Sequence, residues 1–108
     1  MDCRHADAKA GLAQVELLRR TDGVDPATAK KAADADASDV ASQLLVADLE
    51  FMAGRVEEAF ARLTGTVRVT AGDDREQARN RLLELFEIAG PSDPRVTRAR
   101  TDLASALF

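Results

Sequence analysis

The stretch LAQVELL at residues 12–18 returns as VADLEFM at residues 46–52, with a similar residue at every position. The two stretches lie 34 residues apart, and LLELFEI at residues 82–88 is a weaker third copy, two residues later than a strict period predicts. Leucine, alanine and glutamate are common in these stretches, and all three are good helix formers. A repeat of about 34 residues is typical of stacked helix pairs. The repeat therefore predicts an all-α fold of three antiparallel helical hairpins, stacked as a short α-solenoid.

Turn and capping residues divide the chain into six helical segments. Asp25-Pro26 and Asp93-Pro94 each place a capping residue before a proline at the first helical position. Gly90-Pro91 is a stop signal, and Asp73 with Glu76 resembles a capping box. The expected helices cover about residues 6–20, 26–35, 39–53, 56 to at least 67, 73–89, and 94 to the end of the chain.

Two of these segments differ in how they present apolar residues. In the first, Leu12, Val15 and Leu18 form one helical stripe. The third, over residues 39–53, is apolar on nearly every side, so neighbours must cover it on more than one face. We therefore expect the third helix at the centre of the fold.

The middle unit resembles the tetratricopeptide repeat family. Ala47, Gly54 and Ala59 match the family's small residue on the first helix, its turn glycine and its small residue on the second helix. Small residues let two helix axes approach closely. The pattern also departs from the family, since Glu50 stands where an aromatic residue is usual and Arg20 where the first unit should have its turn glycine. A generic antiparallel helical bundle is the alternative fold.

A more specific resemblance involves the end of the chain. Residues 81–96 and 103–108, with residues 11–18 and 54–60, are similar to the C-terminal region of bacterial chaperedoxins. These proteins join an N-terminal thioredoxin-like domain to tetratricopeptide repeats. The resemblance implies that residues 1–108 are a single helical domain, the C-terminal part of a longer protein, without the redox chemistry of the family. It also implies contacts with unfolding client proteins, chaperonin or Hsp70.

Composition and charge exclude several classes of function. The 108 residues carry a net charge of −4, which argues against nucleic acid as the main partner because phosphate binding needs a basic face. No apolar run approaches the roughly 20 residues needed to cross a bilayer, and residues 1–10 are not of signal-peptide type. We therefore expect a cytoplasmic protein that binds neither nucleic acid nor membrane.

The residue pattern contains no recognisable catalytic or metal site. Cys3 and His5 are the only soft ligands, whereas a structural zinc site normally needs four ligands. Asp34, Asp36 and Asp39 lack the glycine and terminal glutamate of an EF-hand loop, and helix capping explains them. A single histidine near the N-terminus makes a catalytic triad improbable. We predict a non-catalytic protein with no cofactor.

A partner-binding surface is expected on the concave side of the solenoid, which the first helices of each pair form. An extended or helical peptide is the expected ligand. The polar side chains predicted to contact it are Gln14, Asp48, Glu50 and Glu84. Leu107 and Phe108 end the chain and are a second candidate contact, because exposed apolar residues often mark interaction sites.

Homodimerisation is the alternative function. The terminal helices of a solenoid need a cover. If the first helix has none, Ala10 and Leu17 are the residues expected to pair two copies of the chain.

Overall fold

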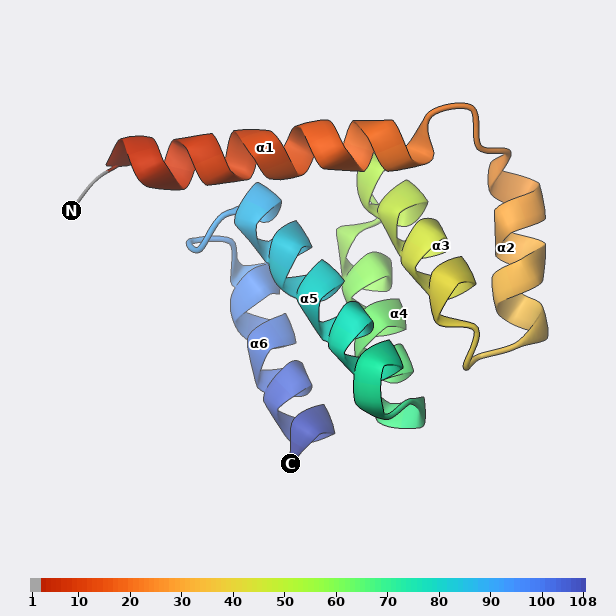
Figure 1. Cartoon of the computed structure of the whole chain (residues 1–108). Helices are drawn as coiled ribbons and strands as arrows, with labels where there is room; N and C mark the ends of the chain where they lie inside the picture. Colours follow the sequence, from red (N-terminus) through yellow and green to blue (C-terminus); the bar gives the residue numbers. More distant parts are fainter. Residues whose placement is uncertain (1–2) are drawn as a thin grey trace.

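The computed structural model describes residues 3–108, with side chains from residue 8 onward, and this part contains helices but no strands (Figure 1). The helices are α1 (Cys3–Thr21), α2 (Pro26–Ala35), α3 (Val40–Met52), α4 (Val56–Val69), α5 (Gly72–Ala89) and α6 (Pro94–Leu107). The predicted all-α class and all six predicted helices are confirmed, with ends within a few residues of those expected. The side chains of Cys3 and His5 lie outside the described part.

Capping side chains and glycines set the helix ends. The Asp39 carboxylate accepts a hydrogen bond from the backbone N–H of Ser42, and the Asp93 carboxylate accepts one from the N–H of Arg95. Gly90 follows α5 with a φ of 98° and donates its N–H to a carbonyl of the last turn at 2.8 Å. Glycine adopts such a positive φ without strain. These ends follow the signals present in the sequence.

The start of α5 differs from the prediction. The capping box expected at Asp73 and Glu76 is wrong, because α5 begins at Gly72 and Ala71 occupies the capping position without a side-chain hydrogen bond. Asp73 and Asp74 lie in the first helical turn instead. Their negative charges there interact favourably with the helix dipole.

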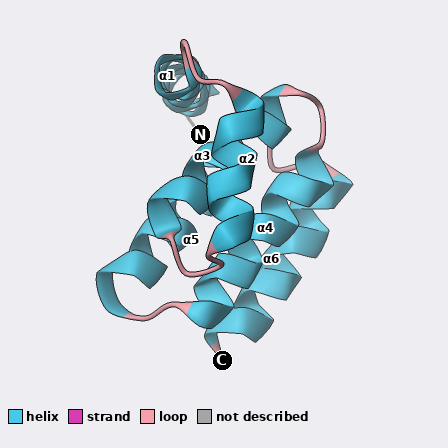
Figure 2. Ribbon diagram, turned by 90° about the vertical axis from the view of Figure 1, so that its right-hand side faces the viewer, coloured by secondary structure: helices cyan, strands magenta, loops and turns pink. Residues whose placement is uncertain are grey.

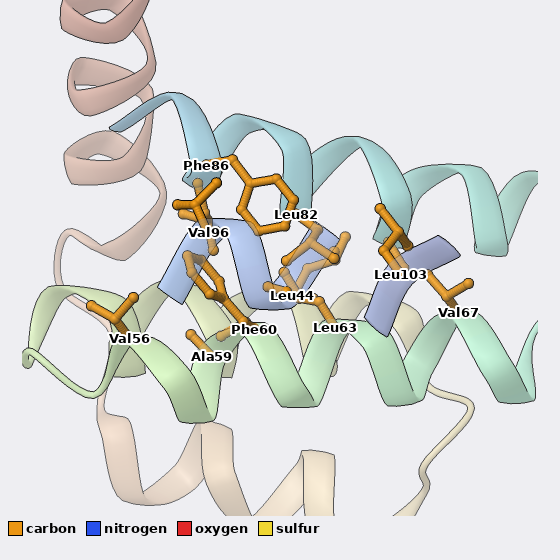
Figure 3. Close-up of a cluster of buried hydrophobic side chains, with 14 of the residues drawn as sticks. Leu44, Val56, Ala59, Phe60, Leu63, Val67, Leu82, Phe86, Val96 and Leu103 are labelled. Carbon is orange, nitrogen blue, oxygen red and sulfur yellow. The ribbon is translucent and has the colours of Figure 1, made fainter. Parts of the chain in front are cut away.

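Helix α4 lies at the centre of the main hydrophobic core, packed against α3, α5 and α6. The ring of Phe60 on α4 meets the ring of Phe86 on α5 edge to face, with 5.0 Å between centroids, which is a favourable aromatic geometry. Figure 3 shows this core. Its buried residues include Leu44, Val56, Ala59, Phe60, Leu63, Val67, Leu82, Phe86, Val96 and Leu103.

Helix α3 separates this core from a smaller apolar cluster. The smaller cluster joins Ala29 and Ala33 of α2 to Val46 of α3. Because α3 contacts α1, α2, α4 and α5, it needs apolar residues on nearly every side. The prediction that neighbours cover α3 on more than one face is confirmed, although α4 contributes more residues to the main core.

The first two helices do not pack against each other as a simple hairpin. Helix α2 packs on α3, whereas α1 lies crosswise over α3 and α5 (Figures 1 and 2). The link at residues 22–25 turns at Gly23, which has a φ of 72°. As a result, α1 covers the side of the molecule that α3 and α5 share.

The small residues predicted at the helix crossing allow a direct test. Ala47 and Ala59 are both fully buried in the main core. Ala59→Leu should lower the free energy of unfolding by about 1–3 kcal/mol, because the added carbons have no room. Ala61→Leu is the matched control, since Ala61 is exposed on the same helix and should tolerate the change. Urea unfolding followed by circular dichroism measures both, and equal losses would contradict the assigned packing.

Candidate functional site

The surface predicted to bind a partner is the concave side formed by α1, α3 and α5. In the structure, α1 lies across the face that α3 and α5 share. Ala13 and Leu17 of α1 are buried there, and Leu17 joins the main core. This face is therefore occupied by the chain itself. The contacts that hold α1 in place therefore shape this site.

Four charged side chains from α1, α3 and α5 meet where α1 crosses the other two helices. Asp48 on α3 is fully buried, and its carboxylate accepts hydrogen bonds from Nε and Nη2 of Arg20 at 2.9 and 3.3 Å. Nη1 of Arg81 on α5 donates to the same carboxylate. Nη1 of Arg20 also donates to Glu84 on α5 at 3.1 Å. We call Arg20, Asp48, Arg81 and Glu84 the charge cluster; it links α1, α3 and α5.

Burial dominates the electrostatics of the charge cluster. It raises the pKa of Asp48 above the ordinary value, although the hydrogen bond from Arg20 and the charges of both arginines act in the opposite direction. Burial acts against the charge of Arg20, but its bonds to Asp48 and Glu84 outweigh this effect and raise the pKa of Arg20. For Arg81, burial lowers the pKa, and the nearby positive charge of Arg20 adds to this effect. Two positive and two negative groups thus share a site where an unpaired charge would be strongly unfavourable.

Glu50, another predicted contact residue, belongs to a different polar network. Its carboxylate accepts a hydrogen bond from Nε of Arg62 on α4 at 2.8 Å, and Arg62 also donates to the side chain of Gln43. Gln43 donates to the backbone carbonyl of Ala33 at the end of α2. This network joins α2, α3 and α4, so the structure separates Glu50 from Asp48 and Glu84.

The remaining predicted residues lie apart from both networks. Gln14 is exposed on α1. Leu107 is half-buried and packs against the main core, whereas Phe108 is exposed beyond the end of α6. The chain ends on the opposite side of the molecule from α1 (Figure 1). Of the six predicted contact residues, the structure brings only Asp48 and Glu84 together.

Helix α1 also carries an exposed apolar surface, made by the stripe that the sequence predicted. Leu12, Val15 and Leu18 are 62%, 49% and 58% exposed, while Ala13 and Leu17 face inward. We call Leu12, Val15 and Leu18 the outer stripe. The stripe follows helical spacing, as predicted, and it faces solvent. The arginine at position 20, where a turn glycine was expected, was the one signal that α1 has an unusual role.

Neither metal-binding clusters nor membrane-spanning helices occur among the described residues. No three or more His, Cys, Asp or Glu side chains within this part are arranged to hold a metal ion. None of the helices that the structure describes is both long and apolar enough to cross a membrane. Asp34 pairs with Lys30 and Asp36 accepts hydrogen bonds from Ser38, so these two aspartates are used locally.

Two neighbouring arginines test the charge cluster. Arg20→Ala should lower the free energy of unfolding by about 2 kcal/mol at neutral pH, because Asp48 loses a charged hydrogen-bond donor inside the protein. Arg19→Ala is the control, because Arg19 makes only an exposed ion pair with Glu16, and it should lose less than about 0.5 kcal/mol. Chemical unfolding at several pH values measures both variants.

The pH dependence of this effect has a defined sign. Removing Arg20 removes one group that lowers the pKa of Asp48, so the folded-state pKa of Asp48 rises further. A raised folded-state pKa favours the folded protein in acid and disfavours it as the pH increases. The difference in the free energy of unfolding between wild type and Arg20→Ala should therefore become smaller as the pH falls through the acidic range. A difference that grows would contradict the pairing of Arg20 with Asp48.

Comparisons with known proteins agree with this architecture. The sequence model of a family described as tetratricopeptide repeat matches residues 19–108. The chain is 39% identical over 102 residues to an uncharacterized protein of Mycobacterium bovis and to uncharacterized proteins of two Mycobacterium tuberculosis strains. The match covers 94% of this chain but only 33% of each relative, so the chain spans a third of their length. No solved structure matches it. Its helical architecture and the match over residues 19–108 together place the chain in the tetratricopeptide repeat family.

Proposed function

We propose that the chain is the protein-binding module of a thioredoxin-family co-chaperone in the cytoplasm, which holds unfolding client proteins or contacts chaperones without catalysing a reaction. Membership of the tetratricopeptide repeat family makes it a protein–protein interaction module. The resemblance of residues 81–96 to chaperedoxins supports the co-chaperone context. The relatives also support it, because two thirds of their length lies outside the shared segment and has room for another domain.

The outer stripe of α1 is the observation that carries this proposal. Leu12, Val15 and Leu18 recur every three residues along one helix and are each about half exposed or more. Apolar side chains gathered on a surface gain free energy when another apolar surface removes them from water. An unfolding protein exposes such surfaces along its chain. The outer stripe therefore fits transient, sequence-tolerant binding of client segments.

Aggregation assays with a heat-denatured client protein test this role. The triple variant Leu12→Gln, Val15→Gln, Leu18→Gln should lose most of the ability to delay aggregation, because glutamine removes the apolar surface and remains a good helix former. Arg19→Gln is the matched control, since Arg19 is exposed on the same helix and lies outside the stripe. Light scattering over time measures the delay, and thermal unfolding checks that all variants are folded.

Homodimerisation is the second candidate, and the same outer stripe favours it. An apolar stripe on a helix can pair with its own copy about a two-fold axis. Leu17, which the sequence assigned to such an interface, lies in the main core instead, so the outer stripe would take its place. Size-exclusion chromatography with light scattering separates the candidates. A wild-type dimer that the triple variant converts to a monomer, with no effect on client aggregation, would favour the dimer over the client-binding role.

A chaperone contact at the C-terminus is tested separately. Phe108 is exposed, whereas Leu107 packs on the core, so only Phe108 can be changed without disturbing the fold. Phe108→Ala should reduce the capture of chaperonin or Hsp70 by the immobilised chain severalfold. Ser105→Ala, at an exposed position of α6, should leave it unchanged. Equal capture by wild type and Phe108→Ala would remove the C-terminus from the contact.

A further inference from the structure

Helix α1 contributes little to the main core. Among residues 8–108, whose side chains the structure describes, the core has fifteen buried residues, and only Leu17 of these comes from α1. The remaining residues come from α3, α4, α5 and α6, which pack on one another independently of α1. The match to the tetratricopeptide repeat family begins at residue 19, close to the end of α1 at Thr21. Helix α1 thus lies almost entirely outside the segment that the family model matches, although it carries the first copy of the 34-residue repeat.

The inner face of α1 has a distinct chemical pattern. Lys9, Ala13, Leu17 and Arg20 follow one another at four-, four- and three-residue spacing, which places them on one side of a helix. A small residue and one leucine are buried, with a basic residue on either side of them. This face is that of a short basic amphipathic helix.

The surface beneath α1 is complementary to that pattern. Lys9 pairs with Glu87 of α5 at 3.2 Å, and Arg20 pairs with Asp48 and Glu84. A cavity of about 340 Å³ remains between α1 and α5, lined by Leu12 and Glu16 of α1 and by Leu83, Glu84 and Glu87 of α5. The face of α3 and α5 therefore has acidic groups at both ends of a small apolar patch.

If α1 moved away from this surface, every buried charge on it would still have a partner of opposite sign. Arg81 of α5 stays bound to Asp48 and also lies near Glu84, so both carboxylates keep a partner when Arg20 departs. The link at residues 22–25 turns at a glycine with positive φ, and Asp22, Gly23 and Asp25 are exposed. The contacts that would break are those of one helix face, which suits a segment that opens without unfolding the rest.

We propose that the face of α3 and α5 bearing Asp48, Glu84 and Glu87 is a binding site for a basic amphipathic helix of a partner protein, and that α1 fills this site as an intramolecular ligand. The inference goes beyond the proposed function, which concerns the outer stripe of α1. A partner helix competes with α1, so its apparent affinity is reduced by the fraction of molecules in which α1 is bound. The partner helix carries an arginine that pairs with Asp48 and Glu84, and a nearby leucine that becomes buried.

A labelled synthetic peptide of residues 8–21 is the probe for the competition, with fluorescence anisotropy as the readout on the full chain. Leu17→Ala in the chain weakens α1 and leaves the acidic face intact, so this variant should bind the peptide at least about tenfold more tightly than wild type does. Arg19→Ala is the matched control, because Arg19 lies on the exposed side of α1, outside the outer stripe, and should leave the affinity at the wild-type value. The same peptide with Arg20→Ala should bind Leu17→Ala at least about tenfold more weakly.

Hydrogen exchange on the wild-type chain provides a measurement that requires no variant. The amides of α1 should exchange well before those of α4, and excess peptide should speed their exchange further. Equal protection of α1 and α4 would overturn the proposal, as would a folded Leu17→Ala chain that binds the peptide no better than wild type. Leu17→Ala could also form a dimer that excess peptide does not separate. That result would overturn the proposal, because the site would then bind α1 of a second copy of the chain. Client aggregation is a separate readout, so failure of this inference leaves the outer-stripe proposal to its own test.

Discussion

A fully buried carboxylate constrains the whole of one side of this protein. Asp48 is shielded from water, and a charge in that position requires close partners of opposite sign. Arg81 on α5 supplies one and Arg20 on α1 supplies the other. Asp48 thereby ties both α5 and α1 to α3. Glu84 then balances the second guanidinium group.

The helices differ in the size of the side chains that they bury, and therefore in how strongly they are packed. Phenylalanine and leucine side chains from α4, α5 and α6 fill the main core, with all four helices from α3 onward contributing. Helix α2, by contrast, buries only Ala29 and Ala33. Alanine removes little apolar surface from water, so α2 gains little from packing. We expect the two N-terminal helices to be the less stable part of the fold, which fits a region that exchanges partners.

Much of the fold was accessible from the sequence because its signals are local. Prolines after aspartates and a glycine at position 90 marked helix ends. The resemblance to the tetratricopeptide repeat identified Ala47 and Ala59 as small residues at a helix crossing, and both are buried. The candidate site was less accessible, because its partners are far apart in the chain: Arg20 and Asp48 are separated by 28 residues. The inner and outer sides of α1 both carry leucine, so periodicity alone could not decide which side faces the core. The failed capping box at Asp73 shows that a short motif does not fix a helix start when the preceding glycine can extend the helix by one residue.

The pairing of Arg20 with Asp48 has a consequence for how the sequence can change over time. Loss of Arg20 alone weakens the support of a buried charge, and loss of Asp48 alone leaves two guanidinium groups facing each other with only Glu84 between them. Neither single step is neutral, whereas replacing both residues with apolar ones of similar volume can preserve stability. Among descendants of a common ancestor, positions 20 and 48 should therefore be inherited as a unit, so that chains with one of the two charges also have the other. The exception is a chain in which α1 no longer covers this face. Such a chain can lose Arg20, provided that Arg81 remains.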